Sequence, residues 1–126
     1  MDRIPPRKAI LYIEDDPANR ILARRVLEAE GYRVLEAESG IQGLEIAQAE
    51  QLGAILVDIH MPDMDGFEVM TRLKSMPTTA SVPVIALTAM VMKGDRERTL
   101  DAGCSAYIEK PIDVDLLPAQ VASVLR

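Results

Sequence analysis

The sequence predicts an α/β fold in which helices cover both faces of an open, doubly wound parallel sheet of five strands. Short apolar runs alternate with segments that repeat apolar residues at helical spacing, and such alternation implies parallel strands joined by right-handed crossovers. The chain has 126 residues, about half of what a closed eight-stranded barrel needs. Hydrophobic residues make up 48% of the chain but aromatic residues only 3%, so the core must be aliphatic.

The first strand and helix follow directly from the pattern. The apolar run Ala9–Ile13 is bounded by charged residues and is typical of a buried strand. Asp16 suits the N-cap of a helix and Pro17 its first position. Gly31 follows the apolar stripe of this segment and is expected to end the helix.

The second unit is more polar. Residues 32–37 mix apolar and charged side chains, which is typical of a strand at the edge of a sheet. Ser39 and Gln42 fit a capping box, with Ser at the N-cap and Gln at the third helical position. We expect the helix to continue to about Leu52, with Gly53 after it.

The central strand occupies residues 54–58, a continuous apolar run that ends in the carboxylate of Asp58. Pro, Asp and Gly residues then mark a turn, and a third helix is expected from about Asp65 to near Pro77. Ligand chemistry in open α/β sheets takes place at the carboxyl ends of the strands. Taken alone, Asp58 could equally well cap the turn that follows it.

The remaining elements repeat the alternation. Pro118 falls early in the last of these elements and would remove a backbone donor from that helix unless the helix starts near Asp115. The expected elements are a strand at 83–87 that ends at Thr88, a helix at about 95–102, a strand at 106–108 and a helix that carries apolar residues up to Leu125.

The bulk properties exclude several classes. A formal net charge of −6 at pH 7 argues against a nucleic-acid partner. Apolar stretches are too short to span a membrane, and residues 1–8 lack the apolar core of a signal peptide. The single cysteine, Cys104, excludes a disulfide framework and suits a small buried side chain. We expect one cytoplasmic domain over residues 1–126, with 1–8 as a short tail.

Five polar groups follow the carboxyl ends of different predicted strands: Glu14, Asp15, Asp58, Thr88 and Lys110. These ends meet on one side of a parallel sheet, where three carboxylates repel one another. A divalent cation would relieve this repulsion, and an all-oxygen ligand set favours Mg²⁺. With a lysine and a threonine hydroxyl nearby, the set suits a phosphoryl group carried on a carboxylate.

Rival sites are absent from the sequence, which has no glycine-rich phosphate loop and no Ser/His/Asp set. The only histidine, His60, lies two residues after Asp58. We expect its side chain to be a solvated loop group, whereas its backbone carbonyl is well placed to point at a bound metal.

The polar groups lie in motifs that, in this order and spacing, resemble the receiver domain of two-component response regulators. The resemblance extends from Ala9 to Leu125 and is carried by residues 13–16, 57–66, 87–89 and 107–111. It implies a flavodoxin-like sheet with strand order 2-1-3-4-5. Residues 92–95 and 103–107 are most similar to single-domain regulators and to the receivers of hybrid kinases.

The resemblance also implies the metal site and the phosphoacceptor. Asp58 would accept the phosphoryl group. Asp15, Asp58 and the backbone carbonyl of His60 would bind Mg²⁺, and Glu14, where many receivers have Asp, would act indirectly.

The same resemblance implies that Lys110 contacts the phosphoryl group and that Thr88 and Tyr107 form a switch pair. The partners would be a histidine kinase or histidine phosphotransferase and a downstream protein bound through the last two helices and the last strand. Two departures concern that docking surface: Ile112 stands where many receivers have Phe, and Pro118 falls early in the last helix.

The function expected from the sequence is a phosphorylation-dependent switch without an output domain of its own. It would assist its own phosphorylation and dephosphorylation but would not be an enzyme. One alternative is a Mg²⁺-dependent phosphoryl-transfer enzyme of the haloacid-dehalogenase kind, which needs a second Asp two residues after the nucleophile, where this chain has His60. Another is a binding module that is never phosphorylated, against which the complete set of acidic, Thr and Lys residues counts.

Overall fold

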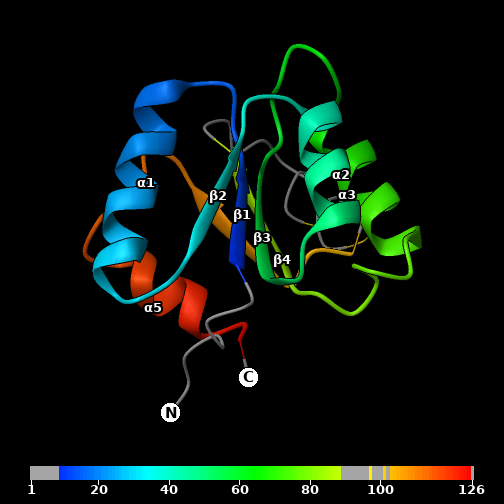
Figure 1. Ribbon diagram of the computed structural model, residues 1–126. Coiled ribbons are helices and arrows are strands. Elements are labelled where there is room, and N and C mark those ends of the chain that lie inside the picture. Colours follow the sequence, from blue (N-terminus) through cyan, green and yellow to red (C-terminus); the bar gives the residue numbers. More distant parts are fainter. Residues whose placement is uncertain (1–8, 89–96, 98–100, 102, 126) are drawn as a thin grey trace.

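The computed structural model describes residues 9–88, 97, 101 and 103–125, in which a five-stranded parallel sheet lies between two layers of helices (Figure 1). The strand order is β2-β1-β3-β4-β5, which confirms the predicted doubly wound fold. In chain order the elements are β1 (Ala9–Ile13), α1 (Pro17–Ala29), β2 (Val34–Ala37), α2 (Gly40–Ala49), β3 (Leu52–Asp58), α3 (Gly66–Ser75), β4 (Val84–Thr88), β5 (Ala106–Glu109) and α5 (Leu117–Ala122).

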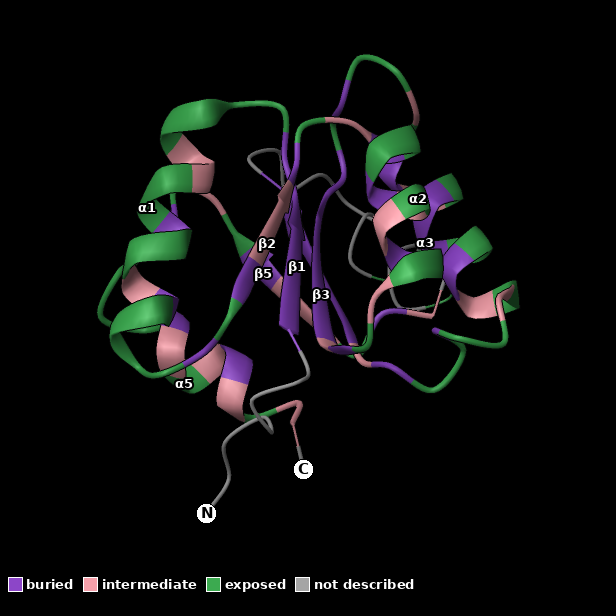
Figure 2. Ribbon diagram, viewed as in Figure 1, coloured by how far each residue is buried: buried purple, intermediate pink, exposed green. Residues whose placement is uncertain are grey.

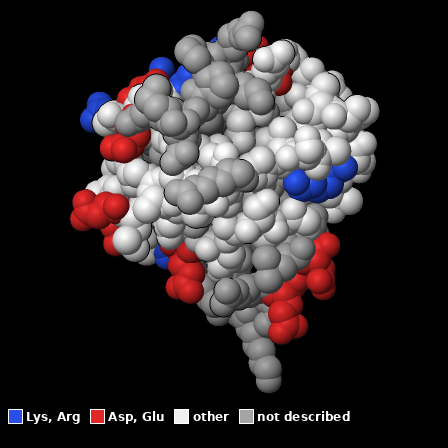
Figure 3. All heavy atoms as spheres, turned by 90° about the horizontal axis from the view of Figure 1, so that it is seen from below, with Lys and Arg blue, Asp and Glu red and all other residues white. Residues whose placement is uncertain are grey.

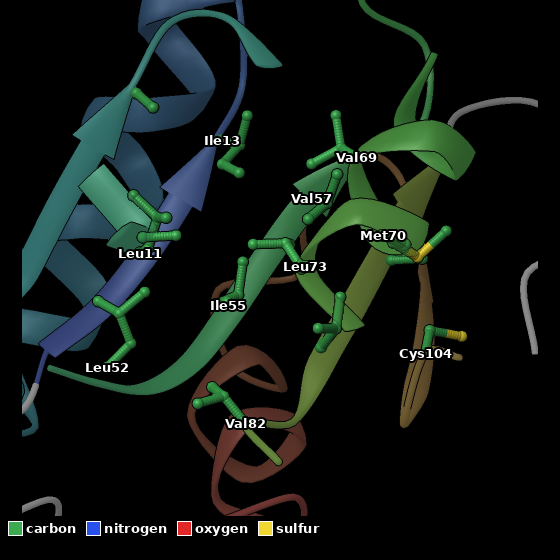
Figure 4. Close-up of a cluster of buried hydrophobic side chains, with 14 of the residues drawn as sticks. Leu11, Ile13, Leu52, Ile55, Val57, Val69, Met70, Leu73, Val82 and Cys104 are labelled. Atoms are coloured by element: carbon green, nitrogen blue, oxygen red, sulfur yellow. The ribbon is translucent and has the colours of Figure 1, made fainter. Parts of the chain in front are cut away.

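Both faces of the sheet are buried (Figure 2). Because side chains alternate along a strand, Ile10 and Tyr12 of β1 face α1 and α5, whereas Leu11 and Ile13 face α2 and α3. Figure 4 shows the second of these layers, where apolar side chains of α3 such as Leu73 pack on β1 and β3. The core is aliphatic, as the composition predicts.

The predicted starts of α1 and α2 are confirmed. The Asp16 carboxylate accepts a hydrogen bond from the Ala18 N–H at 2.9 Å, and Pro17 is the first residue of α1. The Ser39 hydroxyl accepts from the Gln42 N–H at 3.1 Å. The Gln42 side chain reaches back to the Glu38 N–H at 2.8 Å, one residue before the N-cap.

The end of α2 differs from the prediction. The helix was expected to reach about Leu52, but it ends at Ala49, and Leu52 and Gly53 are the first residues of β3. Leu52 pairs with Ala9 of β1, and its side chain is buried in the core. Pairing with the neighbouring strand therefore stops the helix earlier than its local sequence suggests.

The last helix is also shorter than expected, because α5 begins at Leu117 and ends at Ala122. Pro118 lies in its first turn, where the missing N–H has no partner within the helix in any case, as expected. The N–H of Leu117, the first residue of α5, donates to the Asp113 carbonyl at 2.9 Å. The chain thus turns from about Asp113, and a regular helix follows only later.

Other expectations concern smaller features. β2 begins at Val34, later than expected, and Cys104 is buried as predicted. The helix expected at about 95–102 lies mostly outside the described residues. Among the helices that the structure does describe, none has the length and hydropathy to cross a membrane.

The strands all run in one direction, so the two ends of the sheet differ. Figure 3 views the end at which the strands begin, where uncharged residues occupy much of the centre and Asp and Glu side chains group near the rim. The carboxyl ends of the strands, with the predicted polar groups, lie at the opposite end (Figure 1).

The loop after β3 returns closely upon itself at the start of α3. The Gly66 N–H donates to the Ile59 carbonyl at 2.9 Å. A Cβ atom on Gly66 would lie 2.5 Å from the Ile59 Cα and 2.7 Å from the Asp58 carbonyl oxygen. Both obstacles are backbone atoms, so no side-chain rotation could make room for it.

Gly66→Ala should therefore lower the free energy of unfolding by about 2–3 kcal/mol, because the added methyl group forces the backbone of the loop apart. Urea unfolding followed by circular dichroism measures the change. Glu68→Ala, at an exposed position in the same helical turn, is the control and should change stability little. Equal effects of the two substitutions would contradict the proposed close contact.

Candidate functional site

The structure brings the predicted polar groups together at the carboxyl end of the sheet. The register places Ile13 beside Val57, so Glu14, the next residue along the chain, lies near Asp58. β4 ends at Thr88, and β5, its neighbour, is followed by Lys110. Glu14, Asp58 and Thr88 are buried, and Lys110 is largely so.

Three carboxylates form the acidic part of this site. Glu14, Asp15 and Asp58 each offer an oxygen atom within 4.8 Å of the others. Glu14 is fully buried and Asp58 is 3% exposed, whereas Asp15 is exposed, so the cluster opens to solvent on the Asp15 side. An all-oxygen set of this kind fits Mg²⁺, which binds through one or two carboxylates and keeps several waters.

Lys110 lies between two of the carboxylates. Its Nζ is 2.5 Å from Glu14 Oε1 and 3.1 Å from Asp58 Oδ2. Burial alone would lower the pKa of Lys110, but its contacts with Glu14 and Asp58 outweigh burial and raise that pKa. The lysine therefore stays charged.

The pKa of Glu14 shifts in the direction opposite to the one that an ion pair alone would produce. Burial of its carboxyl and the neighbouring Asp58 raise its pKa, while Lys110 acts to lower it. The cost of burying a charge prevails over the attraction of one cation, which is shared with Asp58. Three carboxyl groups and one lysine ammonium thus make up the charged part of the site.

Further residues hold Glu14, and the sequence analysis missed them. The buried Tyr12 hydroxyl donates to Glu14 Oε1 at 3.0 Å, and the Asn19 side-chain amide donates to the same oxygen at 3.3 Å. Arg20 Nη1 donates to the Glu14 backbone carbonyl at 2.8 Å. A signal existed for Tyr12, because residues two apart in a strand share a face; Asn19 and Arg20 depend on how α1 docks.

The loop after β3 contributes one contact to the phosphoacceptor candidate. The His60 backbone N–H donates to Asp58 Oδ1 at 3.1 Å, and the His60 side chain is exposed, as expected. The two oxygens of Asp58 thus have different neighbours, a backbone N–H on one and the Lys110 ammonium on the other. The metal-binding role of the His60 carbonyl stays a prediction.

The predicted switch residues lie on adjacent strands. Thr88 is buried at the end of β4 and pairs in register with Glu109 of β5. Tyr107 pairs with Ala86 and packs against the apolar cluster beneath α2 and α3. Their proximity is consistent with a common role, which stays a prediction.

Comparisons with known proteins agree on one family. A family profile described as the response regulator receiver domain matches residues 10–122. The chain is 40% identical over 118 residues to the polar-differentiation response regulator DivK of Brucella ovis, which covers 94% of this chain and 96% of that protein.

Solved structures give the same result. The receiver domain of the sensor histidine kinase PA1611 from Pseudomonas aeruginosa PAO1 is 34% identical, with a TM-score of 0.85 over 94% of this chain and 97% of that one. It holds a magnesium ion coordinated in its active site cleft. A CheY-like receiver domain protein from Methanospirillum hungatei JF-1 is 30% identical, with a TM-score of 0.87 over 94% and 93% of the two chains.

Tyr12→Phe should lower the free energy of unfolding by about 1.5–3 kcal/mol, because it removes a buried hydrogen bond to a carboxylate while keeping the ring. Urea unfolding of the metal-free protein measures this loss. Tyr32→Phe changes a buried tyrosine of the same apolar cluster, away from the carboxylates, and should have a smaller effect. A neutral Tyr12→Phe would mean that the hydroxyl does not support Glu14.

Proposed function

This chain belongs to the response regulator receiver domain family, and from that premise we propose that it is a switch that accepts a phosphoryl group on Asp58. The donor would be a phosphohistidine on a histidine kinase or histidine phosphotransferase. The observation that carries this proposal is the placement of Asp58: a nearly buried carboxylate at the end of the central strand, with Lys110 3.1 Å from one of its oxygens. The family is one of signalling domains, which fits a switch better than an enzyme with its own substrate.

The proposed transfer is a simple exchange of bonds. A carboxylate oxygen of Asp58 attacks the phosphorus atom, and the phosphorus–nitrogen bond of the phosphohistidine breaks. The imidazole leaves with the electron pair of that bond and takes a proton from water. Lys110 would offset the negative charge on the phosphoryl oxygens, because its ammonium already lies beside Asp58.

Mg²⁺ is the cofactor that we propose for this site. Asp15, Asp58 and the His60 carbonyl would bind it, and a bound Mg²⁺ would neutralise charge on the transferring phosphoryl group. Glu14 would act indirectly, since its Oε1 already accepts hydrogen bonds from Tyr12 and Asn19 and pairs with Lys110. The exposed Asp15 marks the side from which the ion would enter.

The output of the switch would start at Thr88 and Tyr107. The Thr88 hydroxyl would hydrogen-bond the phosphoryl group, and Tyr107 would turn inward as neighbouring segments shift, which is a change of population between two states. A downstream protein would then bind through β5, α5 and the helix expected at about 95–102, which lies mostly outside the described residues. We also propose that the chain acts in the cytoplasm as one domain.

Phosphorylation should occur on Asp58. Incubation with Mg²⁺ and phosphoramidate should add one phosphate that is stable in acid and labile in base, and Asp58→Asn should fold and take up none. Intact-protein mass spectrometry measures the uptake. Asp115→Asn, which changes an exposed carboxylate far along the chain, is the control and should be labelled like the wild type. Label on His60 or on a serine would contradict the proposal.

Mg²⁺ should stabilise the folded protein, because it binds a site that only the folded chain assembles. With a dissociation constant of about 1 mM, about 10 mM Mg²⁺ would add roughly 1.4 kcal/mol, or several degrees in melting temperature. The increment should shrink in Asp58→Asn and nearly vanish in Asp15→Ala. Without metal, Asp58→Asn should melt higher than the wild type, because one repelling charge is gone.

Thermal melts of the wild type, Asp58→Asn and Asp15→Ala with and without Mg²⁺ measure these increments. An equal increment in all three would place the ion elsewhere, and the assignment of Asp15 and Asp58 as ligands would be wrong.

A further inference from the structure

A contact between α2 and the loop after β3 is not explained by the proposed function. In this loop, Asp63 Oδ1 accepts a hydrogen bond from the Gly40 N–H at 3.1 Å, and Oδ2 accepts from the Ile41 N–H at 3.2 Å. Gly40 and Ile41 are the first two residues of α2. One carboxylate therefore joins two segments that are more than twenty positions apart in the sequence.

These two N–H groups are among those that a helix leaves without partners in its own backbone. The next two donors of α2 are satisfied locally, because the Gln42 N–H binds the Ser39 hydroxyl and the Gly43 N–H binds the Ser39 carbonyl. Asp63 completes the set, and its negative charge lies at the positive end of the helix dipole.

The first turn of α2 also packs closely against this loop and α3. A Cβ atom on Gly40 would lie 3.0 Å from both Met64 Cβ and Val69 Cγ2, closer than side chains normally approach. In Figure 1 the start of α2 and the loop after β3 lie at the same end of the molecule, above the carboxyl ends of the strands. The helix and the loop therefore meet without a gap.

The same loop carries the atoms that the phosphoacceptor needs. Its ends are fixed to each other, because the Gly66 N–H binds the Ile59 carbonyl and the His60 N–H binds Asp58. Between these ends, Met61 is buried in the core cluster and Met64 packs against it, and Asp63 adds two hydrogen bonds to the backbone of α2. These two hydrogen bonds tie the loop to the first turn of α2 close to the His60 peptide groups, one of which donates to Asp58 and the next of which is proposed to bind Mg²⁺.

We propose that Asp63 is a positioning residue for the phosphoacceptor site: by binding the first two N–H groups of α2, it holds the loop so that the His60 backbone faces Asp58 and the metal. Asp63 itself would contact neither ion nor phosphoryl group. This inference rests on the proposed function, because it concerns how well that site binds Mg²⁺ and reacts.

Four variants separate positioning from simpler effects. Asp63→Ala removes both hydrogen bonds, and Asp63→Asn keeps one acceptor oxygen while losing the same charge. Ser39→Ala removes a different cap of the same helix without touching the loop. Glu38→Gln removes a charge from an exposed side chain beside the start of α2.

The apparent Mg²⁺ dissociation constant, from melting temperature against Mg²⁺ concentration, is the first readout. Residues that support metal ligands typically change affinity by about 10-fold or more, so Asp63→Ala should weaken Mg²⁺ binding by about 10-fold. The Mg²⁺ dissociation constant of Asp63→Asn should lie between those of Asp63→Ala and the wild type. Asp63→Asn should also bind Mg²⁺ more weakly than Glu38→Gln does. Ser39→Ala should melt lower than the wild type but keep its Mg²⁺ dissociation constant.

The rate of phosphorylation by phosphoramidate at saturating donor is the second readout. It should fall in the order wild type, Asp63→Asn, Asp63→Ala, with Ser39→Ala and Glu38→Gln close to the wild type. If Asp63→Ala does not fold, the rate and the Mg²⁺ dissociation constant are compared between Asp63→Asn and Glu38→Gln instead.

Two results would overturn the inference: Asp63 variants that match Ser39→Ala in Mg²⁺ affinity and rate, which would make Asp63 a helix cap only, or Asp63→Asn equal to Asp63→Ala and to Glu38→Gln, which would reduce its role to charge. A wild type that neither responds to Mg²⁺ nor takes up phosphate would instead refute the proposed function.

Discussion

The ammonium of Lys110, shared between Glu14 and Asp58, is the interaction on which the site depends. Two buried carboxylates lie against one largely buried ammonium group, and a third carboxylate, Asp15, lies beside them in solvent. Burying charge is costly unless partners compensate it, and here the compensation is incomplete. The pKa of Glu14 is raised, mainly by burial of its carboxyl and then by the neighbouring Asp58, although Lys110 acts to lower it. A bound cation would offset this charge, which is the physical reason for proposing Mg²⁺ at the three carboxylates.

The parallel sheet is what makes this arrangement possible. Each strand delivers its following residue to the same end, so groups far apart in the sequence meet without any direct sequence signal between them. The register between β1 and β3 brings Glu14 to Asp58, and β5 brings Lys110 to both. This is why the site could be predicted from the sequence: once the apolar runs were assigned as strands, the residues after them had to converge.

The parts that the sequence did not reveal depend on docking between elements. Asn19 and Arg20 support Glu14 only because the first turn of α1 lies beside the end of β1. Tyr12 is the exception, because its position two residues before Glu14 already places the two side chains on one face. The end of α2 was misplaced for a similar reason, since Leu52 satisfies its backbone in β3 and not in the helix. Local patterns locate caps and strand ends well, whereas contacts across elements need the three-dimensional arrangement.

The supports of the site come from both layers of helices. On one side, α1 holds the acidic turn through Arg20, which also contacts Glu36 of the edge strand β2 at 3.3 Å. On the other side, α2 holds the loop after β3 through Asp63. The metal and phosphoryl groups would bind where these two supported segments meet. Because neither support touches the reacting atoms, each can vary without changing the chemistry, which offers a physical route by which domains with the same reactive residues could differ in metal affinity and phosphorylation rate.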